Sequence, residues 1–270
     1  MKIAGVDGGC STTKVSWFAD RKGGAVVSMS THDNDLESMI QIMKKDGITH
    51  IMPTGINVPE TLTSQFEVLE PKGDPISWEI KCHTVGVKLL MNDPFPWNCL
   101  IVSLGTGTSY TRCLFGKPFK IPIGNALGMG YLKGVGSFVT GDGGQALTSQ
   151  ELDVCAARAE GESLDLKVKD FLPDHPAKDL VVSHFGAATW NDRNHKAERA
   201  LSHLNVVTTS IAKDIGVYGL FCKHVIFVGG GTQMKTMMSQ LKDWVTFLGK
   251  EAHVVDSTHT DSIGAALLSS

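Results

Sequence analysis

One pattern occurs twice in this chain, about 97 residues apart, and it constrains the fold more than any other feature. Each copy has three short apolar runs separated by glycine-containing turns. The runs span residues 2–7, 14–19 and 25–29 in the first copy, and 98–104, 110–115 and 119–123 in the second. Such runs and turns are typical of a three-stranded β-meander. The repetition therefore predicts two structurally similar halves.

Apolar residues with helical spacing follow each predicted meander. These stretches span 34–45 and 76–91 in the first half, and 144–158, 196–221, 232–248 and 261–268 in the second. Further strands are expected at 225–228 and 253–256, and Asp142-Gly143-Gly144 is expected to cap the helix that follows it. Mixed sheets covered by helices in two similar halves are the simplest arrangement. We therefore expect an α/β fold with one subdomain at 1–96, another at 97–270, and a ligand in the cleft between them.

The composition excludes several classes of function. The chain has 270 residues, of which 42% are hydrophobic, and these can bury one or two ordinary cores. A net charge of −3 argues against nucleic acid as the main partner. No apolar run approaches the roughly 20 residues that span a bilayer, and the start lacks the apolar core of a signal peptide. We therefore expect no membrane association and a cytoplasmic location.

Cysteine and histidine spacing indicates no zinc or redox motif. The six cysteines form no C-x-x-C pair, and the ten histidines form no H-x-x-x-H or H-E-x-x-H pattern. We expect reduced, mostly buried cysteines and no metal site built by the protein alone. A metal that arrives with a nucleotide remains open.

Three glycine-rich segments are candidate phosphate-binding turns. Neither a P-loop nor a Rossmann fingerprint is present. The candidates are Asp7-Gly8-Gly9-Cys10-Ser11, Gly105-Thr106-Gly107-Thr108-Ser109 and Gly229-Gly230-Gly231-Thr232. Glycine lets backbone N–H groups approach an anion, and Ser and Thr hydroxyls add donors. The third segment opens a helix, where N–H groups are free to bind a ligand. Each segment alone is also compatible with an ordinary structural turn.

The order of these segments resembles the two phosphate loops and the adenosine loop of the actin, sugar kinase and Hsp70 superfamily. Within it, the chain resembles the type II pantothenate kinases. The stretches that carry this resemblance are 104–109, 165–169, 183–186 and 261–267, and they lie in the family's order. The resemblance implies two similar actin-like (ribonuclease H-like) domains, with mixed sheets flanked by helices and a nucleotide cleft between them.

The same resemblance implies an ATP-dependent kinase that phosphorylates the primary hydroxyl of pantothenate, the first step of coenzyme A biosynthesis. The implied nucleotide-binding residues are Asp7, Gly8, Gly9, Ser11, Lys14, Gly105, Thr106, Gly107, Thr108, Gly229, Gly230 and Gly231. Asp7 follows the first strand and is the candidate Mg²⁺ ligand, directly or through water. The family also implies a homodimer, for which the amphipathic stretch 196–221 is a candidate interface.

Glu79 is the candidate catalytic base. Asp74-Pro75 predicts a helix start, and Glu79 lies in the early turns that follow. In the family, a glutamate followed seven residues later by glycine accepts the proton of the substrate hydroxyl, and Glu79 and Gly86 have this spacing. Residues seven apart share one helix face, and glycine lets another backbone or the substrate approach. The alternative is a solvent-exposed glutamate that favours the positive end of the helix dipole.

The candidate substrate-binding residues lie on the second meander and in the glycine-rich run after it. They are Ser109, Arg112, Lys120, Gly128 and Gly130. The family's arginine position, which helps to hold pantothenate, falls on Ile121 or, with a one-residue shift, on Lys120. Lysine lacks the planar fork that favours carboxylates, so pantetheine or another pantoyl amide is the alternative acceptor.

Two further classes stay open. A sugar kinase of the N-acetylglucosamine type would have similar phosphate loops but would need an aspartate base. A non-kinase ATPase switch could be a filament subunit, which has no use for Glu79, or an activator of a partner reductase. Such activators carry clustered cysteines for an iron–sulfur centre, and the cysteines of this chain are scattered.

Overall fold

The computed structural model describes residues 1–9, 12–19, 25–31, 35–55, 57–71, 73–91, 94–140, 146–160, 162–176, 178–189, 195–255 and 257–269. The chain divides into two compact units. The first unit comprises Met1–Ile101, Thr111–Ile121 and Val254–Ser270, and the second comprises Val102–Tyr110 and Pro122–His253. This division differs from the expected subdomains at 1–96 and 97–270, because a hairpin and the C-terminal helix pack with the first unit.

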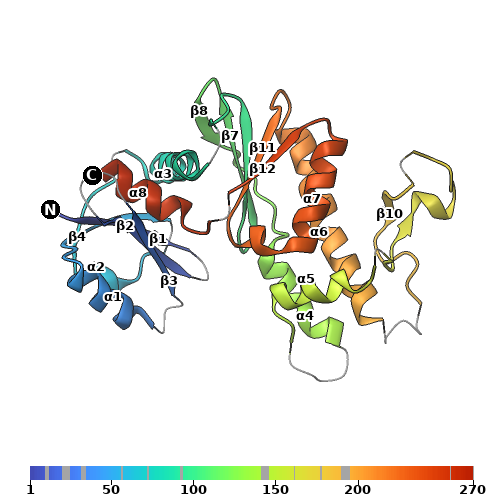
Figure 1. The fold of residues 1–270 in the computed structure, drawn as a ribbon, viewed down its shortest axis with the longest axis horizontal. Coiled ribbons are helices and arrows are strands. Elements are labelled where there is room, and N and C mark those ends of the chain that lie inside the picture. The colour runs from blue at the N-terminus through green and yellow to red at the C-terminus, as the bar shows by residue number, and fades with distance from the viewer. Residues whose placement is uncertain are drawn as a thin grey trace. The chain divides into compact units, whose positions relative to one another are not determined.

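A five-stranded sheet with the order β3-β2-β1-β4-β5 forms the centre of the first unit (Figure 1). Its strands are β1 (Ile3–Gly8), β2 (Thr13–Phe18), β3 (Val26–Thr31), β4 (His50–Gly55) and β5 (Glu67–Val68). The first three form the predicted antiparallel meander, and β4 pairs with β1 in parallel. The sequence reasoning missed β4, whose Pro53 is a residue that rarely occupies a central strand.

Helices cover both faces of this sheet (Figure 1). They are α1 (Leu36–Lys45), α2 (Glu60–Thr63), α3 (Pro75–Leu90) and α8 (Thr260–Ser269). Because alternate residues of a strand point to opposite faces, Ala4 and Val6 of β1 pack with residues of α1 and α2. Ile3 packs on the other face with Trp78 of α3 and Ala265 of α8.

The helices α3 and α8 approach each other at backbone distance. A methyl group on Gly86 would overlap the carbonyl oxygen of Thr260, and one on Gly264 would overlap that of Cys82. Of the two groups that Gly86 was expected to let approach, another backbone or the substrate, the structure has the backbone of α8 there. As predicted, Asp74 caps α3, and its carboxylate accepts a 2.9 Å hydrogen bond from the N–H of Ser77.

A second five-stranded sheet has the order β12-β11-β6-β7-β8. Its strands are β6 (Cys99–Leu104), β7 (Thr108–Leu114), β8 (Lys117–Lys120), β11 (His224–Val228) and β12 (Glu251–Val254). The predicted second hairpin is present as β7 and β8, which pair in antiparallel fashion. The last strand starts at Glu251, two residues before its predicted start at 253.

Four helices and a small two-stranded sheet complete the second unit (Figure 1). They are α4 (Met129–Thr140), α5 (Ser149–Ala157), α6 (Lys196–Tyr218), α7 (Lys235–Phe247), β9 (Leu166–Lys167) and β10 (Val181–Ser183). The side of α6 that carries Leu204, Val207 and Ile211 is buried, and α6 packs against the other three helices. The apolar stripe proposed for dimerisation is therefore used within the chain.

Two helix predictions need correction. The sequence reasoning missed α4, which contains glycines that lower helix propensity. The helix expected from residue 144 starts at Ser149 as α5, because Thr148 and Glu151 form a capping box there. The expected cap at Asp142 lies outside the described residues.

The cysteines agree with the prediction of reduced, mostly buried thiols. Five lie in the described part of the chain and all are free. Cys82, Cys99, Cys113 and Cys222 are buried, and Cys155 is partly exposed. Among the helices of the described residues, none is long and apolar enough to cross a membrane.

Candidate active site

Three ion pairs bring six charged side chains together in the first unit. Lys14 Nζ lies 3.0 Å from Asp7 Oδ2, Lys120 Nζ lies 2.6 Å from Glu79 Oε1, and His83 Nδ1 lies 2.9 Å from Asp261 Oδ1. The pairs also interact with one another, because the negative charge of Glu79 raises the pKa of both Asp7 and His83. We call these six residues the charged cluster.

Strand pairing places Asp7 and Lys14 beside each other. Asp7 lies near the end of β1, and Lys14 is its direct partner on the antiparallel strand β2. Gly55, whose φ is +79°, leaves room for the aspartate, because a methyl group there would lie 2.8 Å from Asp7 Oδ1. The first predicted phosphate turn therefore begins at a buried carboxylate.

Burial raises the pKa of Asp7, the negative charges of Asp261 and Glu79 act in the same direction, and Lys14 opposes them. The folded protein thus holds a carboxylate whose ionised form it disfavours. A divalent cation would relieve this cost, and carboxylate oxygens are the ligands that Mg²⁺ prefers. The chemistry of Asp7 therefore fits the Mg²⁺ that the sequence reasoning assigned to it.

Glu79 and Lys120 are held by different elements of the first unit. Glu79 lies in the second turn of α3, and Lys120 is the last residue of β8, which contacts α3. Their side chains are 30% and 33% exposed, so both can meet a ligand from solvent. The ion pair uses only one oxygen of Glu79, Oε1, and the second carboxylate oxygen can therefore take a proton.

The pair formed by His83 and Asp261 was missed by the sequence reasoning. Burial by itself would lower the pKa of His83, but the carboxylates of Asp261 and Glu79 raise it above its ordinary value. Burial likewise disfavours the charge on Asp261, but His83, with Lys14 and Lys120, lowers its pKa. Both results favour a charged pair. The position of His83, one helical turn after Glu79, was visible in the sequence, but nothing nearby in the chain indicates Asp261 as its partner.

Cys82 lies on α3 next to the charged cluster but is not a nucleophile. Burial raises the pKa of its thiol to about 12, and the charge of Asp261 adds to this effect. A thiol must be ionised to attack, so Cys82 stays unreactive at neutral pH.

In the second unit, two of the predicted glycine turns meet. Residues 105–107 join β6 to β7, and residues 229–231 follow β11. Gly229 has a φ of +92°, and a methyl group on it would lie 2.8 Å from the carbonyl oxygen of Leu104. A methyl group on Gly231 would lie 2.7 Å from Leu104 Cβ. The 229–231 turn therefore packs against Leu104, the residue that directly precedes the 105–107 turn.

Only the tip of the 105–107 turn is available to a ligand. The N–H of Gly105 donates to the carbonyl oxygen of Gly107 at 3.0 Å. The N–H of Thr108 donates to the carbonyl oxygen of Asn125 at 2.8 Å. The Thr108 hydroxyl donates to the Leu127 carbonyl at 3.0 Å. Thr106 and Gly107 are exposed.

The glycine-rich run after β8 supports this turn. The N–H of Gly130 donates to the carbonyl oxygen of Thr106 at 2.9 Å. A methyl group on Gly128 would lie 2.8 Å from the same oxygen. Both glycines therefore have a packing role, and their role in substrate binding stays a prediction.

The remaining predicted residues have varied surroundings. Gly9 donates its N–H to the Thr12 carbonyl at 3.2 Å, and the preceding Gly8 packs against the backbone of Asn57. Ser109 and Arg112 are half-buried on β7, where Arg112 is the direct partner of Phe119 on β8. Ser11 lies outside the described residues.

A polar anchor that the sequence reasoning missed fixes the segment after β8 to α6. Asn125 Nδ2 donates to Asp214 Oδ2 at 2.7 Å and to Ser210 Oγ at 2.8 Å. The Tyr110 hydroxyl donates to the same Asp214 oxygen at 2.6 Å. These bonds orient the glycine-rich run beside the 105–107 turn.

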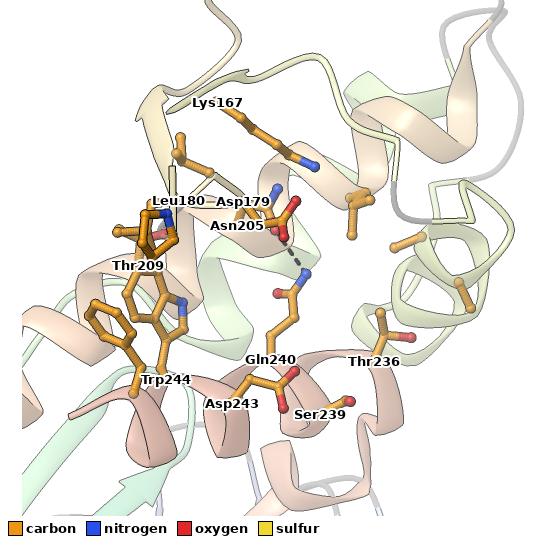
Figure 2. Close-up of a pocket in the computed structure, with 16 residues that line it drawn as sticks. Lys167, Asp179, Leu180, Asn205, Thr209, Thr236, Ser239, Gln240, Asp243 and Trp244 are labelled. Carbon is orange, nitrogen blue, oxygen red and sulfur yellow. Dashed lines mark hydrogen bonds between the residues drawn. The ribbon is translucent and has the colours of Figure 1, made fainter. Parts of the chain in front are cut away.

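A cavity of about 620 Å³ lies elsewhere in the second unit, and Figure 2 shows its lining. Lys167, Asn205, Gln240, Asp243 and Trp244 contribute to its wall, and no predicted site residue does. Its size is suitable for a small molecule, but the residues with predicted chemistry lie outside it.

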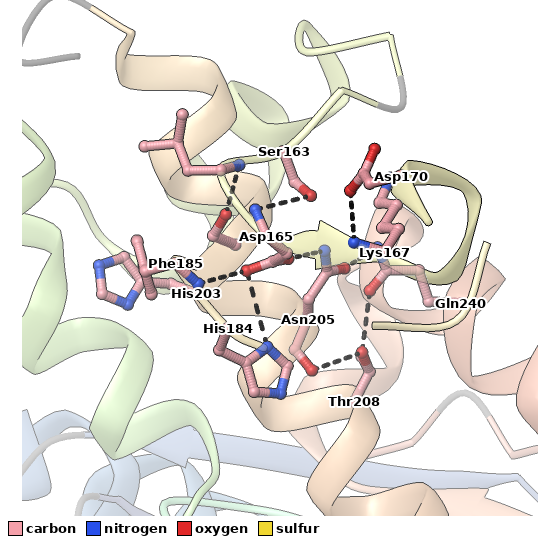
Figure 3. A network of polar contacts seen from close by, with 12 residues as sticks. Ser163, Asp165, Lys167, Asp170, His184, Phe185, His203, Asn205, Thr208 and Gln240 are labelled. Carbon is pink, nitrogen blue, oxygen red and sulfur yellow. Dashed lines mark hydrogen bonds and ion pairs between the residues drawn. The ribbon is translucent and has the colours of Figure 1, made fainter. Parts of the chain in front are cut away.

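Two stretches that carry the family resemblance meet beside this cavity (Figure 3). Asp165 Oδ1 accepts the N–H of Phe185 at 2.9 Å, and Asp165 Oδ2 accepts Asn205 Nδ2 at 2.6 Å. Gln240 Nε2 then donates to Asn205 Oδ1 at 2.8 Å. Asp165 is buried, so these bonds are needed to stabilise its carboxylate. The network links both stretches to α6 and α7, which is a structural role.

Comparison with known proteins yields structural neighbours only. No protein-family model and no curated protein matches the chain. The activator of the 2-hydroxyisocaproyl-CoA dehydratase from Clostridium difficile, with bound ADPNP, is 16% identical, with a TM-score of 0.65 over 99% of this chain and 94% of that chain.

Sugar kinases are also among the neighbours. A ROK family glucokinase from Streptomyces griseus, in complex with glucose and AMPPNP, is 11% identical, with a TM-score of 0.52 over 99% of both chains. A putative N-acetylmannosamine kinase from Listeria monocytogenes is 16% identical, with a TM-score of 0.51 over 99% of this chain and 98% of that chain.

The chain has the fold of these neighbours, with two five-stranded sheets flanked by helices. The predicted fold class is thereby confirmed. The more specific resemblance to type II pantothenate kinases stays a prediction.

Proposed function

We propose that this protein is an ATP-dependent phosphotransferase that uses an alcohol as acceptor, with Glu79 as its base. The observation that carries this proposal is the 2.6 Å contact between Lys120 and Glu79. Sequence reasoning assigned these residues to the acceptor and to its deprotonation from separate motifs. Their contact brings the two side chains to one point in the first unit.

The proposed reaction transfers the γ-phosphoryl group of ATP. The acceptor oxygen forms a bond to the γ-phosphorus while the bond from that phosphorus to the β–γ bridging oxygen breaks, and ADP leaves. The hydroxyl proton passes to the Glu79 carboxylate. Mg²⁺, when bound, neutralises phosphate charge, and Asp7 would be its carboxylate ligand. The backbone of the exposed Thr106 and Gly107 and of the partly exposed Gly230 would bind the nucleotide.

We propose pantothenate as the acceptor, with pantetheine as the alternative. An ammonium group has three N–H donors, and one of them is directed at Glu79, so Lys120 can also donate to an acceptor group. A pantothenate carboxylate would have to compete with Glu79 for this charge. Pantetheine has an amide at that position and needs no such charge.

Two other functions have support from the neighbours. The sugar kinases favour a sugar acceptor, and the dehydratase activator favours an ATPase that switches a partner protein. Against the second function, four of the five described cysteines are buried, which is unsuitable for a shared surface cluster.

An ADP-release assay separates these functions. The acceptors are pantothenate, pantetheine, N-acetylglucosamine, N-acetylmannosamine, glucose and none, each with ATP and Mg²⁺. We expect ADP release only with the two pantoyl compounds. Release that depends on a sugar, or release without an acceptor, would contradict the proposal. The ratio of kcat/KM for pantothenate and pantetheine assigns the preferred acceptor.

We also propose a homodimer, and the exposed apolar residues that follow the buried part of α6 are its candidate surface. Val217, Leu220 and Phe221 are 61%, 54% and 86% exposed. Sedimentation velocity of the wild type and of Phe221→Ser tests this proposal. We expect a dimer that the substitution weakens, and a monomeric wild type would contradict it.

A further inference from the structure

Three side chains with metal-binding groups converge on two neighbouring strands of the second unit. His224 Nδ1 lies 3.0 Å from His253 Nε2 and 3.2 Å from Glu251 Oε2. All three atoms lie within 4.8 Å of one another. We propose that His224, Glu251 and His253 bind a divalent transition-metal ion of the Zn²⁺ class.

The strand geometry explains this convergence. Glu251 and His253 are two residues apart on β12, so their side chains point to the same face. His224 is the first residue of β11, the neighbouring strand, and strands in a sheet lie about 4.8 Å apart. Since β12 is at the edge of the sheet, an ion can reach the three groups from solvent.

A cation suits these three atoms better than hydrogen bonds do. A neutral imidazole has one donor and one acceptor nitrogen, so the 3.0 Å contact between the two rings has room for at most one hydrogen. If His224 Nδ1 carries that hydrogen, it cannot form a full hydrogen bond to His253 Nε2 and to Glu251 Oε2 at the same time. A divalent ion accepts lone pairs from all three atoms.

The two distances from His224 to the other ligands are near those of a tetrahedral site. Zinc–ligand bonds of about 2.0–2.1 Å place two tetrahedral ligands about 3.3–3.4 Å apart, close to the two contacts of His224. Two histidines and one glutamate form a known catalytic zinc set, which leaves a fourth position for water. Two nitrogen ligands disfavour Mg²⁺ and Ca²⁺, so this site differs from the carboxylate at Asp7.

The surroundings orient the ligands. Lys223 Nζ lies 2.6 Å from Glu251 Oε1, and this contact turns Oε2 toward His224.

The proposal departs from the expectation of no metal site built by the protein alone. No short motif contains all three ligands, because they come from two separate strands. Only the pairing of β11 with β12 brings them together.

Metal titration of the full-length, untagged protein tests the proposal. Co²⁺ is added to the wild type, to His224→Gln and to His253→Gln, and Zn²⁺ is then used as a competitor. His50→Gln is a matched control, because His50 Nε2 lies 3.0 Å from Glu67 Oε2 in a similar pair on adjacent strands. Among the described residues, no third metal-binding group joins that pair.

We expect the wild type and the control to bind one equivalent of Co²⁺, with the visible absorption of a low-coordinate ion, and to gain thermal stability from it. Each ligand variant should bind at least about 10-fold more weakly and lose that gain. Three results would overturn the proposal. These are no binding at millimolar metal, unchanged binding in both variants, and a charge-transfer band from cysteine ligation.

Discussion

Lys120 Nζ lies 2.6 Å from Glu79 Oε1, although the two residues are 41 positions apart in the chain. The contact joins the end of β8 to the second turn of α3 within the first unit. It places the carboxylate of the proposed base beside a positive charge that a polar group of the acceptor can also bind. Substitution of either residue should therefore change the electrostatic surroundings of the other.

Substitution of Lys120 should affect the two acceptors differently. A hydrogen bond to a charged group contributes about 1.5–3 kcal/mol, so Lys120→Gln should raise KM for pantothenate about 10-fold to 100-fold. KM for pantetheine should change little, because it has no carboxylate. Lys120→Arg offers a bidentate fork and should lower KM for pantothenate. Steady-state kinetics with both acceptors checks this, and equal changes in the two KM values would contradict it.

Asp7 should lower the stability of the folded protein, although the proposed reaction needs it as a Mg²⁺ ligand. Its pKa is raised in the folded state, so its ionised form costs stability above that pKa. Asp7→Asn should therefore raise Tm at pH 8 and lower kcat at least about 10-fold. The gain in Tm should vanish as the pH falls through the pKa of Asp7, where the wild type becomes neutral.

Asp261→Asn is the matched control for this experiment. The pKa of Asp261 is lowered in the folded state, so its ionised form adds stability above its ordinary value of 3.8. This substitution should lower Tm at pH 8. If both substitutions changed Tm in the same direction, the electrostatic account of the charged cluster would be wrong.

The contribution of His83 to the free energy of unfolding should fall as the pH rises, whereas that of Asp261 should grow. Its pKa is raised above 6.5 by folding, so its stabilisation is complete below pH 6.5 and is lost as the pH rises through the folded pKa. At pH 6, His83→Gln should cost about 3 kcal/mol, because it leaves Asp261 without its partner. Urea unfolding between about pH 6 and pH 9 should show this difference shrink. A difference that grows with pH would be inconsistent with the ion pair.

Gly86 should be essential for packing α3 on α8. A methyl group there would overlap the Thr260 carbonyl oxygen, and backbone cannot move aside as a flexible side chain can. Gly86→Ala should destabilise the protein by about 3 kcal/mol. Gly134→Ala in α4 is the control, because a methyl group at this exposed position meets nothing within 4 Å. It should stabilise by about 0.5–1 kcal/mol through helix propensity. Equal effects in chemical denaturation would refute this account.

Sequence reasoning succeeded where residues close in the chain determine the structure. Asp74 and Pro75 start α3, and the turn glycines separate the strands of both meanders. It failed where distant partners provide the stability. In α4, Gly130, Gly134 and Gly136 lower helix propensity, and packing against α5 and α6 compensates for this.

The candidate site divides in the same way. Glu79 could be proposed as the base from the sequence because its spacing to Gly86 is local and matches a family pattern, and this role stays a prediction. The pairing of His83 with Asp261 joins residues that are 178 positions apart, and no local signal specifies it. The three potential metal ligands on β11 and β12 are likewise visible only after the strands pair.

The most direct test of the central claim is the kcat of Glu79→Gln, measured as ADP release with saturating ATP and pantothenate or pantetheine. Glutamine keeps the shape of the side chain but cannot take the proton, so kcat should fall at least about 100-fold while Tm stays near that of the wild type. Glu60→Gln, at the exposed start of α2, should retain full activity. A Glu79→Gln protein that is folded and turns over at the rate of the wild type would show that Glu79 is not the base.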